Sequence, residues 1–303
     1  MVNYLRHSEI DLTKWDLCVE QSVNSLVYAC SWYLNEVSPN WEGLVYGDYE
    51  AVMPLTQNRK YFISYLYQPF FTQQLGVFSK REITQELLIA FISGIPKKYR
   101  FVDIQLNEQN QILSEKFRII KRKNYLLNLD KSYEKICKNY NTENKRNLKR
   151  AKKNQLEFKT IPYEDVINFY KLHKGVLTKG VRNRDYAKLI EVAAKAYQQK
   201  KLISKGVFSK SGELLSAGIY LIHKNRVTFL LGTSSETGKE TGAMSHLMDL
   251  VIFQFSNHKI TFDFEGSDIQ GVARFFKGFG AEKQSYYRLK INRLPWIFRL
   301  FKS

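Results

Sequence analysis

The chain has few cysteines and no long apolar run. Its three cysteines, Cys18, Cys30 and Cys137, are scattered and odd in number, which excludes a disulfide framework of a small secreted domain. The five histidines form no cluster with metal-ligand spacing. No stretch approaches the ~20 apolar residues of a membrane-spanning helix, and the N-terminal residues carry no apolar signal-peptide segment. We therefore expect a reduced cytoplasmic protein without a metal site.

Acidic residues are also scarce relative to basic ones. The chain has 47 lysines and arginines against 29 aspartates and glutamates, and its formal charge is +18. This balance favours an anionic partner, which includes nucleic acid, a phosphorylated cofactor and an acidic membrane surface, and it does not choose among them. At 303 residues, with 44% hydrophobic and 14% aromatic residues, the chain is long enough for one large or two medium domains with sizeable cores.

The two halves of the chain repeat one order of predicted elements. Three strands within residues 43–67 precede a helix at 84–93 and a strand at 101–106, whereas three strands within 202–231 precede a helix at 244–255 and a strand at 261–265. A returning strand then ends each half. We predict an α/β (α+β) protein of two domains, at residues 1–130 and 131–303. Each domain has a mixed, mostly antiparallel sheet flanked by helices.

The stretch from 261 to 292 carries the strongest candidate site. A short strand ends in Asp263 and Glu265, Gly266 follows, and residues 271–278 have the apolar spacing of a short helix. A strand that ends in carboxylates beside a helix N-terminus is typical of the crevice of an α/β sheet. An edge strand, turn and helix without a site would give the same pattern.

This stretch resembles the C-terminal signature of the Fem-type branch of the GNAT acyltransferase superfamily. The resemblance rests on Asp263-Phe264-Glu265-Gly266-Ser267, Gly271, Phe276-Lys277 and Phe279-Gly280. It implies two tandem GNAT-like domains, the first degenerate, and transfer of an acyl or aminoacyl group to an amine. The donor would be acyl-coenzyme A or aminoacyl-tRNA, with no tightly bound cofactor, and the acceptor a bulky anionic molecule such as a lipid-linked cell-envelope precursor.

The resemblance also assigns roles to residues. In GNAT proteins a loop before the central helix binds the coenzyme A pyrophosphate, and this chain offers Lys239, Gly242 and then Met244, which departs from the superfamily pattern at the last position. Glu265 is the preferred base, because strand alternation places it on the face of Asp263. The full set of candidates comprises catalytic Glu265, Asp263 and Tyr286, donor-binding Leu231, Gly232, Thr233, Lys239, Gly242 and Ala243, and substrate-binding Arg182, Arg184, Asp268, Arg274 and Lys277.

Two other basic segments suggest a different class of function. A predicted helix at residues 144–153 is basic nearly all round, and residues 293–302 mix Trp296 and Phe298 with arginines. The helix is typical of a solvated face or of a site for RNA or phospholipid phosphates. The C-terminal segment is suited to packing on the core or to a membrane interface. The alternative to an enzyme is thus a basic module that binds RNA or an anionic membrane. The oligomeric state is left open.

Overall fold

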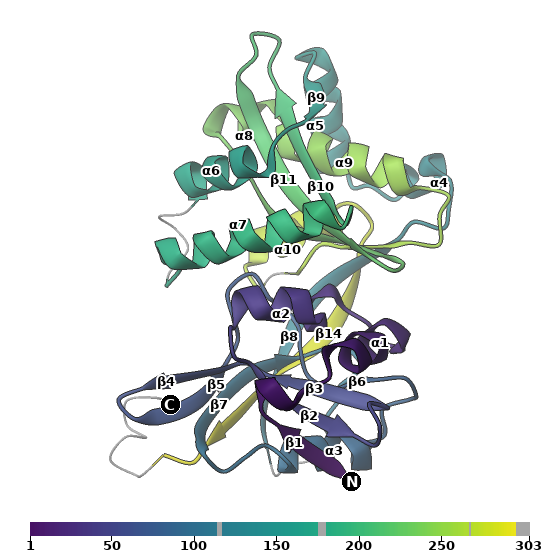
Figure 1. Cartoon of the computed structure of the whole chain (residues 1–303). Coiled ribbons are helices and arrows are strands. Elements are labelled where there is room, and N and C mark those ends of the chain that lie inside the picture. Colours follow the sequence, from purple (N-terminus) through teal and green to yellow (C-terminus); the bar gives the residue numbers. More distant parts are fainter. Residues whose placement is uncertain (114–116, 175–179, 267, 295–303) are drawn as a thin grey trace. The chain divides into compact units, whose positions relative to one another are not determined.

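The computed structural model describes residues 1–113, 117–174, 180–266 and 268–294 (Figure 1). The chain forms two compact units. The first contains Met1–Arg122 together with the chain from Ser285, and the second contains Lys123–Gln284. Each unit is a mixed α/β structure, as the sequence predicts.

The first unit contains two sheets that share one core. One sheet is antiparallel, in the order β1-β2-β3-β6, and the other has the order β4-β5-β7-β14, in which β5 and β7 run parallel. Apolar side chains from both sheets and from α3 pack together, among them Leu44, Leu66, Val102 and Leu289. The elements are β1 (Val2–Leu5), α1 (Leu12–Gln21), α2 (Ser31–Val37), β2 (Glu42–Tyr46), β3 (Ala51–Leu55), β4 (Gln57–Lys60), β5 (Ile63–Tyr67), β6 (Phe78–Ser79), α3 (Gln85–Ser93), β7 (Tyr99–Leu106) and β14 (Glu282–Asn292).

The second unit contains one sheet in the order β8-β13-β12-β11-β10-β9. The pair β12 and β13 is parallel, and the other neighbouring pairs are antiparallel. The strands are β8 (Arg118–Asn128), β9 (Glu157–Thr160), β10 (Leu202–Phe208), β11 (Leu214–His223), β12 (Arg226–Ser234) and β13 (Thr261–Asp263).

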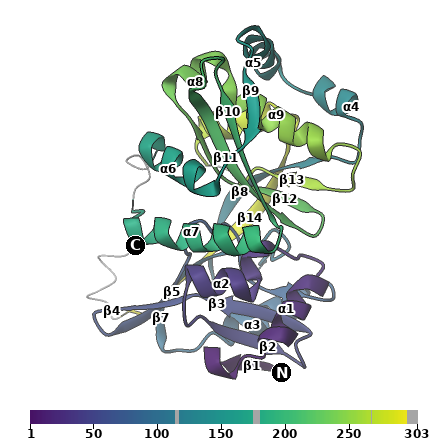
Figure 2. The same ribbon diagram turned by 45° about the horizontal axis from the view of Figure 1, so that its top comes forward.

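Helices cover both faces of this second sheet. Helices α6 (Tyr163–Lys174) and α7 (Asn183–Gln198) lie on one face and α9 (Ala243–Phe255) on the other (Figure 2). The remaining helices are α4 (Tyr133–Lys138), α5 (Thr142–Lys153), α8 (Glu236–Thr241) and α10 (Gln270–Lys277). The core under α9 is rich in aromatic rings, which include Tyr220, Phe262, Phe264 and Phe279.

The final strand of each half of the sequence pairs with a strand from the other half. Strand β8 follows β7 in the sequence but pairs with β13 at Leu126–Asn128, and β14 follows β13 but pairs with β7 at Tyr287–Asn292. The boundaries between the two compact units therefore lie after Arg122 and before Ser285. The sequence predicts a single domain boundary, between residues 130 and 131. The difference arises because strand pairing is a long-range contact that a local pattern does not encode.

Two expectations concern membranes and metals. Among the described residues no helix has the length and apolar character needed to cross a bilayer. Over the same residues no three histidine, cysteine or carboxylate side chains gather as a set of metal ligands. Most of the C-terminal segment at 293–302 lies outside the described residues.

Candidate functional site

A cavity opens where strands β12 and β13 separate. Their parallel pairing covers three positions, from Arg226 with Thr261 to Thr228 with Asp263. Beyond it, β12 continues from Phe229 to Ser234, while the chain after β13 turns towards α10. The cavity has a volume of about 570 Å³. A cavity of this size is large enough for a small-molecule ligand.

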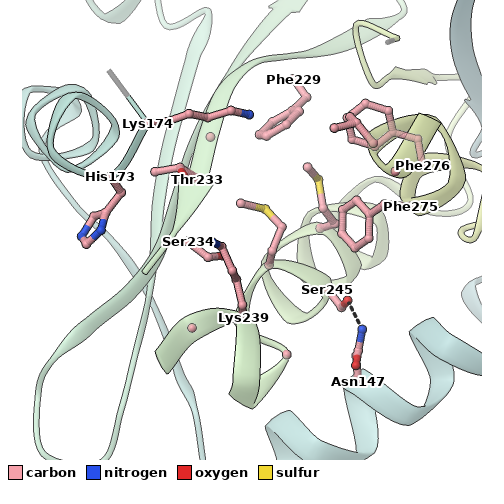
Figure 3. A pocket seen from close by; sticks show the side chains of 17 residues that line it. Asn147, His173, Lys174, Phe229, Thr233, Ser234, Lys239, Ser245, Phe275 and Phe276 are labelled. Carbon is pink, nitrogen blue, oxygen red and sulfur yellow. Dashed lines mark hydrogen bonds between the residues drawn. The ribbon is translucent and has the colours of Figure 1, made fainter. Parts of the chain in front are cut away.

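The cavity has an apolar interior. Its walls come from β12, α9 and α10, and Figure 3 shows Phe229, Phe275 and Phe276 beside two methionine side chains. The methionines are Met244 and Met248. Unbranched methionine side chains adapt to ligands of varied shape. The lining as a whole consists of Asn147, His173, Lys174, Phe229, Gly232, Thr233, Ser234, Gly238, Lys239, Gly242, Met244, Ser245, Met248, Gly271, Val272, Phe275 and Phe276.

A bulge shapes the β12 wall. The pairing with β11 shifts between Ile219–Leu231 and Tyr220–Phe229, so Leu230 is an extra residue on β12. Such a bulge re-aims the side chains and the backbone groups that follow it. Gly232 is the next residue of β12 after Phe229 that lines the cavity, and a Cβ added to it would lie 2.4 Å from the ring of Phe229. Glycine at 232 therefore allows Phe229 to close the wall and leaves the backbone accessible to a ligand.

The segment before α9 is more ordered than the sequence predicts. The expected loop at 238–243 is largely the short helix α8, which Ser235 caps by accepting a hydrogen bond from the Gly238 amide. Gly242 ends α8 and precedes α9 with φ +78°, a conformation that favours glycine. Ser235 and Gly242 were the available cap signals for this helix.

Helix α5 packs against the start of α9. Asn147 Nδ2 donates to Ser245 Oγ at 3.3 Å (Figure 3). A Cβ on Gly242 would lie 2.6 Å from the Asn147 carbonyl oxygen, so the two backbones are in close contact. Asn144 is buried on the same side of α5. The asparagine side of the predicted basic helix therefore faces protein and borders the cavity.

Two lysines give the cavity a positive edge. Lys174, at the end of α6, extends over the cavity towards Phe229, whereas the ring of His173 points away (Figure 3). Burial and the charge of Lys239 lower the pKa of Lys174. Lys239 is itself paired with Glu236 at 2.5 Å. The Glu236 carboxylate offsets part of the charge of Lys239, and the remaining positive charge at this edge of the cavity favours an anionic group on the ligand.

The carboxylate of Asp263 is held by three donors in the second unit. It accepts hydrogen bonds from Asn124 Nδ2 at 3.0 Å, from the Glu265 amide at 2.8 Å and from Arg226 Nη1 at 3.0 Å. Its side chain is 1% exposed. These contacts fix the end of β13 at the point where it leaves β12.

Glu265 follows in an unusual backbone conformation. Its φ is +54°, and the next residue, Gly266, is so close to β8 that a Cβ would lie 2.3 Å from the Lys123 carbonyl oxygen. The residue is only partly buried, yet burial of its carboxyl group raises the pKa well above the usual value. Strain of this kind and a perturbed carboxyl are frequent at functional sites.

The predicted site residues divide into those that line the cavity and those that do not. Gly232, Thr233, Lys239 and Gly242 line it. Leu231 and Ala243 are buried in the core, and Tyr286 is a buried residue of β14 in the first unit. Arg274 on α10 pairs instead with Glu143 at 3.5 Å. The other predicted residues outside the lining are Glu265, Asp263, Asp268, Lys277, Arg182 and Arg184.

Sequence reasoning missed much of the lining. Met244 and Met248 have helical spacing and are typical of core residues. Asn147 and Lys174 come from helices that lie 60 or more residues before α9 in the chain, so no short motif joins them to it. The sequence does indicate Lys239, because it lies with Gly242 in the segment before α9 that the resemblance assigns to donor binding.

Comparison with solved structures places this architecture among known folds. No protein-family model matches the chain, and no curated protein sequence matches it. The crystal structure of FemX is similar over 99% of this chain and 100% of that one, with 12% identity and a TM-score of 0.69. L-PGS from Bacillus licheniformis is similar over 96% of this chain and 95% of that one, with 11% identity and a TM-score of 0.57.

The chain has the fold of FemX. A third structure, the C-terminal domain of a candidate lysylphosphatidylglycerol synthetase from Agrobacterium fabrum, is similar over 96% of this chain and 94% of that one, with 10% identity and a TM-score of 0.56. The resemblance inferred from Asp263 to Gly280 is therefore confirmed at the level of the fold. At 10–12% identity the likeness does not extend to the activity.

Proposed function

We propose that the protein transfers an acyl or aminoacyl group to an amine and that the cavity beside β12 holds the donor. The observation that carries this proposal is the separation of β12 from β13 around a largely apolar cavity with a positive edge. The relatives in fold include FemX and a candidate lysylphosphatidylglycerol synthetase. The name of the second supports aminoacyl transfer, and the resemblance of residues 263–280 to the Fem-type branch supports acyl or aminoacyl transfer as the reaction class.

The cavity suits a donor with an apolar part and a phosphate. The apolar part would contact Met244, Met248 and Phe275, while Lys174 and Lys239 would contact the anionic part. Acyl-coenzyme A and aminoacyl-tRNA both carry phosphates, so both are candidates. The acceptor we propose is the amine of a bulky anionic molecule, such as a lipid-linked envelope precursor.

The reaction needs few protein groups. The amine nitrogen bonds to the carbonyl carbon, the bond to the donor's sulfur or oxygen breaks, and the leaving atom takes up a proton. Backbone N–H groups of Gly232 or Thr233 would stabilise the oxyanion. Glu265 is our proposed acceptor of the amine proton, positioned through Asp263, and water is our proposed source of the proton that the leaving atom takes up. Arg182, Arg184, Asp268, Arg274 and Lys277 remain predicted contacts of the acceptor.

A transfer assay with matched lysine variants tests this proposal. Each donor, acyl-coenzyme A or charged tRNA, carries a label on the group that is transferred. The assay measures how fast the donor loses this label when cell-envelope extracts that contain amines are supplied as the acceptor. The double variant Lys174→Gln/Lys239→Gln is expected to raise KM for the donor about tenfold or more, because charge-assisted contacts to phosphate are lost. Lys210→Gln removes an exposed lysine of the β10–β11 turn and is the control. Equal kinetics for the two variants would contradict the proposed donor site.

The exposed face of α5 supports a second candidate, a non-catalytic module that binds RNA or an anionic membrane. Lys149, Lys152 and Lys153 are exposed on it, whereas Arg150 donates to the Glu240 carbonyl and Lys145 to the Lys138 carbonyl. Reversing the charge of the three exposed lysines therefore removes the charge with little effect on packing. The binding-module function predicts that association with tRNA or anionic vesicles is lost. The enzyme function predicts that donor binding survives.

A further inference from the structure

The hairpin of β4 and β5 carries two aromatic residues on its tip. Lys60 pairs with Ile63, so the turn consists of Tyr61 and Phe62 alone. The residues are 82% and 90% exposed, respectively. Figures 1 and 2 show β4 and β5 extending together from the first unit. Neither aromatic ring contributes to the core of that unit.

The two residues at the tip have a backbone conformation that is unfavourable for bulky side chains. Tyr61 has φ +49° and Phe62 has φ +63°. Positive φ at both positions of a two-residue turn is the pattern for which Asn-Gly is preferred, because bulky side chains crowd the backbone there. A sequence selected for hairpin stability alone would not place tyrosine and phenylalanine at these positions. Departures from local preference of this kind are expected where a residue has a function.

Basic groups surround the aromatic tip. Arg59 lies over the ring of Phe62 at 5.6 Å and Lys60 over the ring of Tyr61 at 5.1 Å. The pairing of Ser64 with Tyr99 brings the start of β7 to the same end of the sheet. Lys97 and Arg100 are exposed there.

One acidic side chain near this end of the sheet, that of Glu42, is already paired. Glu42 is paired with Lys98 at 2.8 Å, so the cations at this end are not offset by it. Arg293 also lies at this end, where it donates to the carbonyls of Ile95, Pro96 and Tyr99. The end of the sheet therefore presents two exposed aromatic rings within a set of positive charges.

We propose that this tip (residues 59–62) docks the protein on an anionic membrane surface. Aromatic side chains with neighbouring lysine or arginine are favoured at the lipid interface, where the rings enter the headgroup region and the cations contact lipid phosphates. A projecting two-residue turn can enter a soft planar surface. An RNA-binding site, by contrast, stacks unpaired bases on aromatics in a groove or on a sheet face. The proposal concerns the first unit and does not depend on the transferase activity.

The test replaces the tip by a turn that folds at least as well. In Tyr61→Asn/Phe62→Gly both positive φ values become favourable, so the melting temperature is expected to stay the same or rise. The control is Tyr197→Ser/Phe253→Ser, which removes one tyrosine and one phenylalanine that are 66% and 56% exposed in the second unit. The full chain is sedimented with vesicles of phosphatidylcholine alone and of phosphatidylcholine with about one-third phosphatidylglycerol. Binding of tRNA is measured in parallel.

The proposal predicts that the wild type and the control bind the anionic vesicles and that the tip variant binds about tenfold or more weakly, because two aromatic side chains leave the interface. Binding should also weaken with salt and on phosphatidylcholine alone. Three outcomes would overturn it: no vesicle binding by the wild type, equal vesicle binding by wild type and tip variant, or loss of tRNA binding with vesicle binding unchanged. The last would assign the tip to a nucleic acid.

Discussion

The close contact between α5 and the start of α9 can be tested with two substitutions of one kind. Gly242 and Gly271 both line the cavity. A methyl group on Gly242 would lie 2.6 Å from the Asn147 carbonyl oxygen at a residue with φ +78°, whereas a methyl group on Gly271 would have nothing within 4 Å. We expect Gly242→Ala to destabilise the protein and Gly271→Ala to stabilise it.

The magnitudes follow from the two environments. For Gly242→Ala, the left-handed backbone costs about 1–2 kcal/mol, and displacing α5 costs a further ~1–3 kcal/mol. The total of about 2–5 kcal/mol corresponds to a fall in melting temperature of roughly 4–20 °C for a unit of this size. For Gly271→Ala, replacing a glycine in the first turn of helix α10 contributes at most about 0.5–1 kcal/mol of stability, the value for a helix interior. The corresponding rise is roughly 1–4 °C.

Thermal unfolding of both variants by circular dichroism provides the measurement. Urea titration gives the free energies of unfolding independently. If Gly242→Ala melts with or above Gly271→Ala, the packing of α5 over Gly242 is not as described, and the assignment of Asn147 to the cavity wall is wrong with it.

Two further predictions concern the end of β13. Because burial holds the native pKa of Glu265 above the unfolded value of about 4.5, the native state binds the proton more tightly, and wild-type stability should fall as pH rises from 4.5 to that native pKa. The Glu265→Gln variant has no carboxyl group to titrate at this position, so the difference between its melting temperature and that of the wild type should increase with pH over that window. Parallel pH profiles would contradict the buried carboxyl. Arg226→Met should cost ~3–5 kcal/mol in urea unfolding, because it leaves the buried Asp263 carboxylate without its cation. Arg226→Lys keeps the charge and should cost less, and equal losses for the two would count against the ion pair.

Local signals predict the elements of the second unit well. The helices at 244–255 and 271–278 appear as α9 and α10, with bounds that differ by one residue, because apolar side chains recur on one face of each. The parallel pair of β12 and β13 also agrees with the predicted order of elements. The acidic end of β13 was identified because carboxylates interrupt an apolar strand.

The contacts between distant segments could not be read from the sequence. The exchange of β8 and β14 depends on pairings such as Phe262 with Leu127 and Leu289 with Ile104, and any apolar strand of the right length would satisfy the same pattern. Because α5 is rich in lysine and arginine, its sequence does not indicate that Asn144 and Asn147 face the protein. The turn at Tyr61 and Phe62 was not predicted because its residues are typical of a strand.

The central claim is that the cavity beside β12 holds the acyl donor, and calorimetric titration tests it most directly. Val272 is a partly buried residue of the lining, so Val272→Trp should fill the cavity. Val23→Trp, at a residue 62% exposed in the first unit, is the matched control. Acetyl-coenzyme A, a longer acyl-coenzyme A and charged tRNA are titrated in turn. We predict saturable binding of at least one donor by the wild type and the control and none by Val272→Trp. Binding that Val272→Trp leaves unchanged, or no binding of any of the three donors by the wild type, would contradict the account.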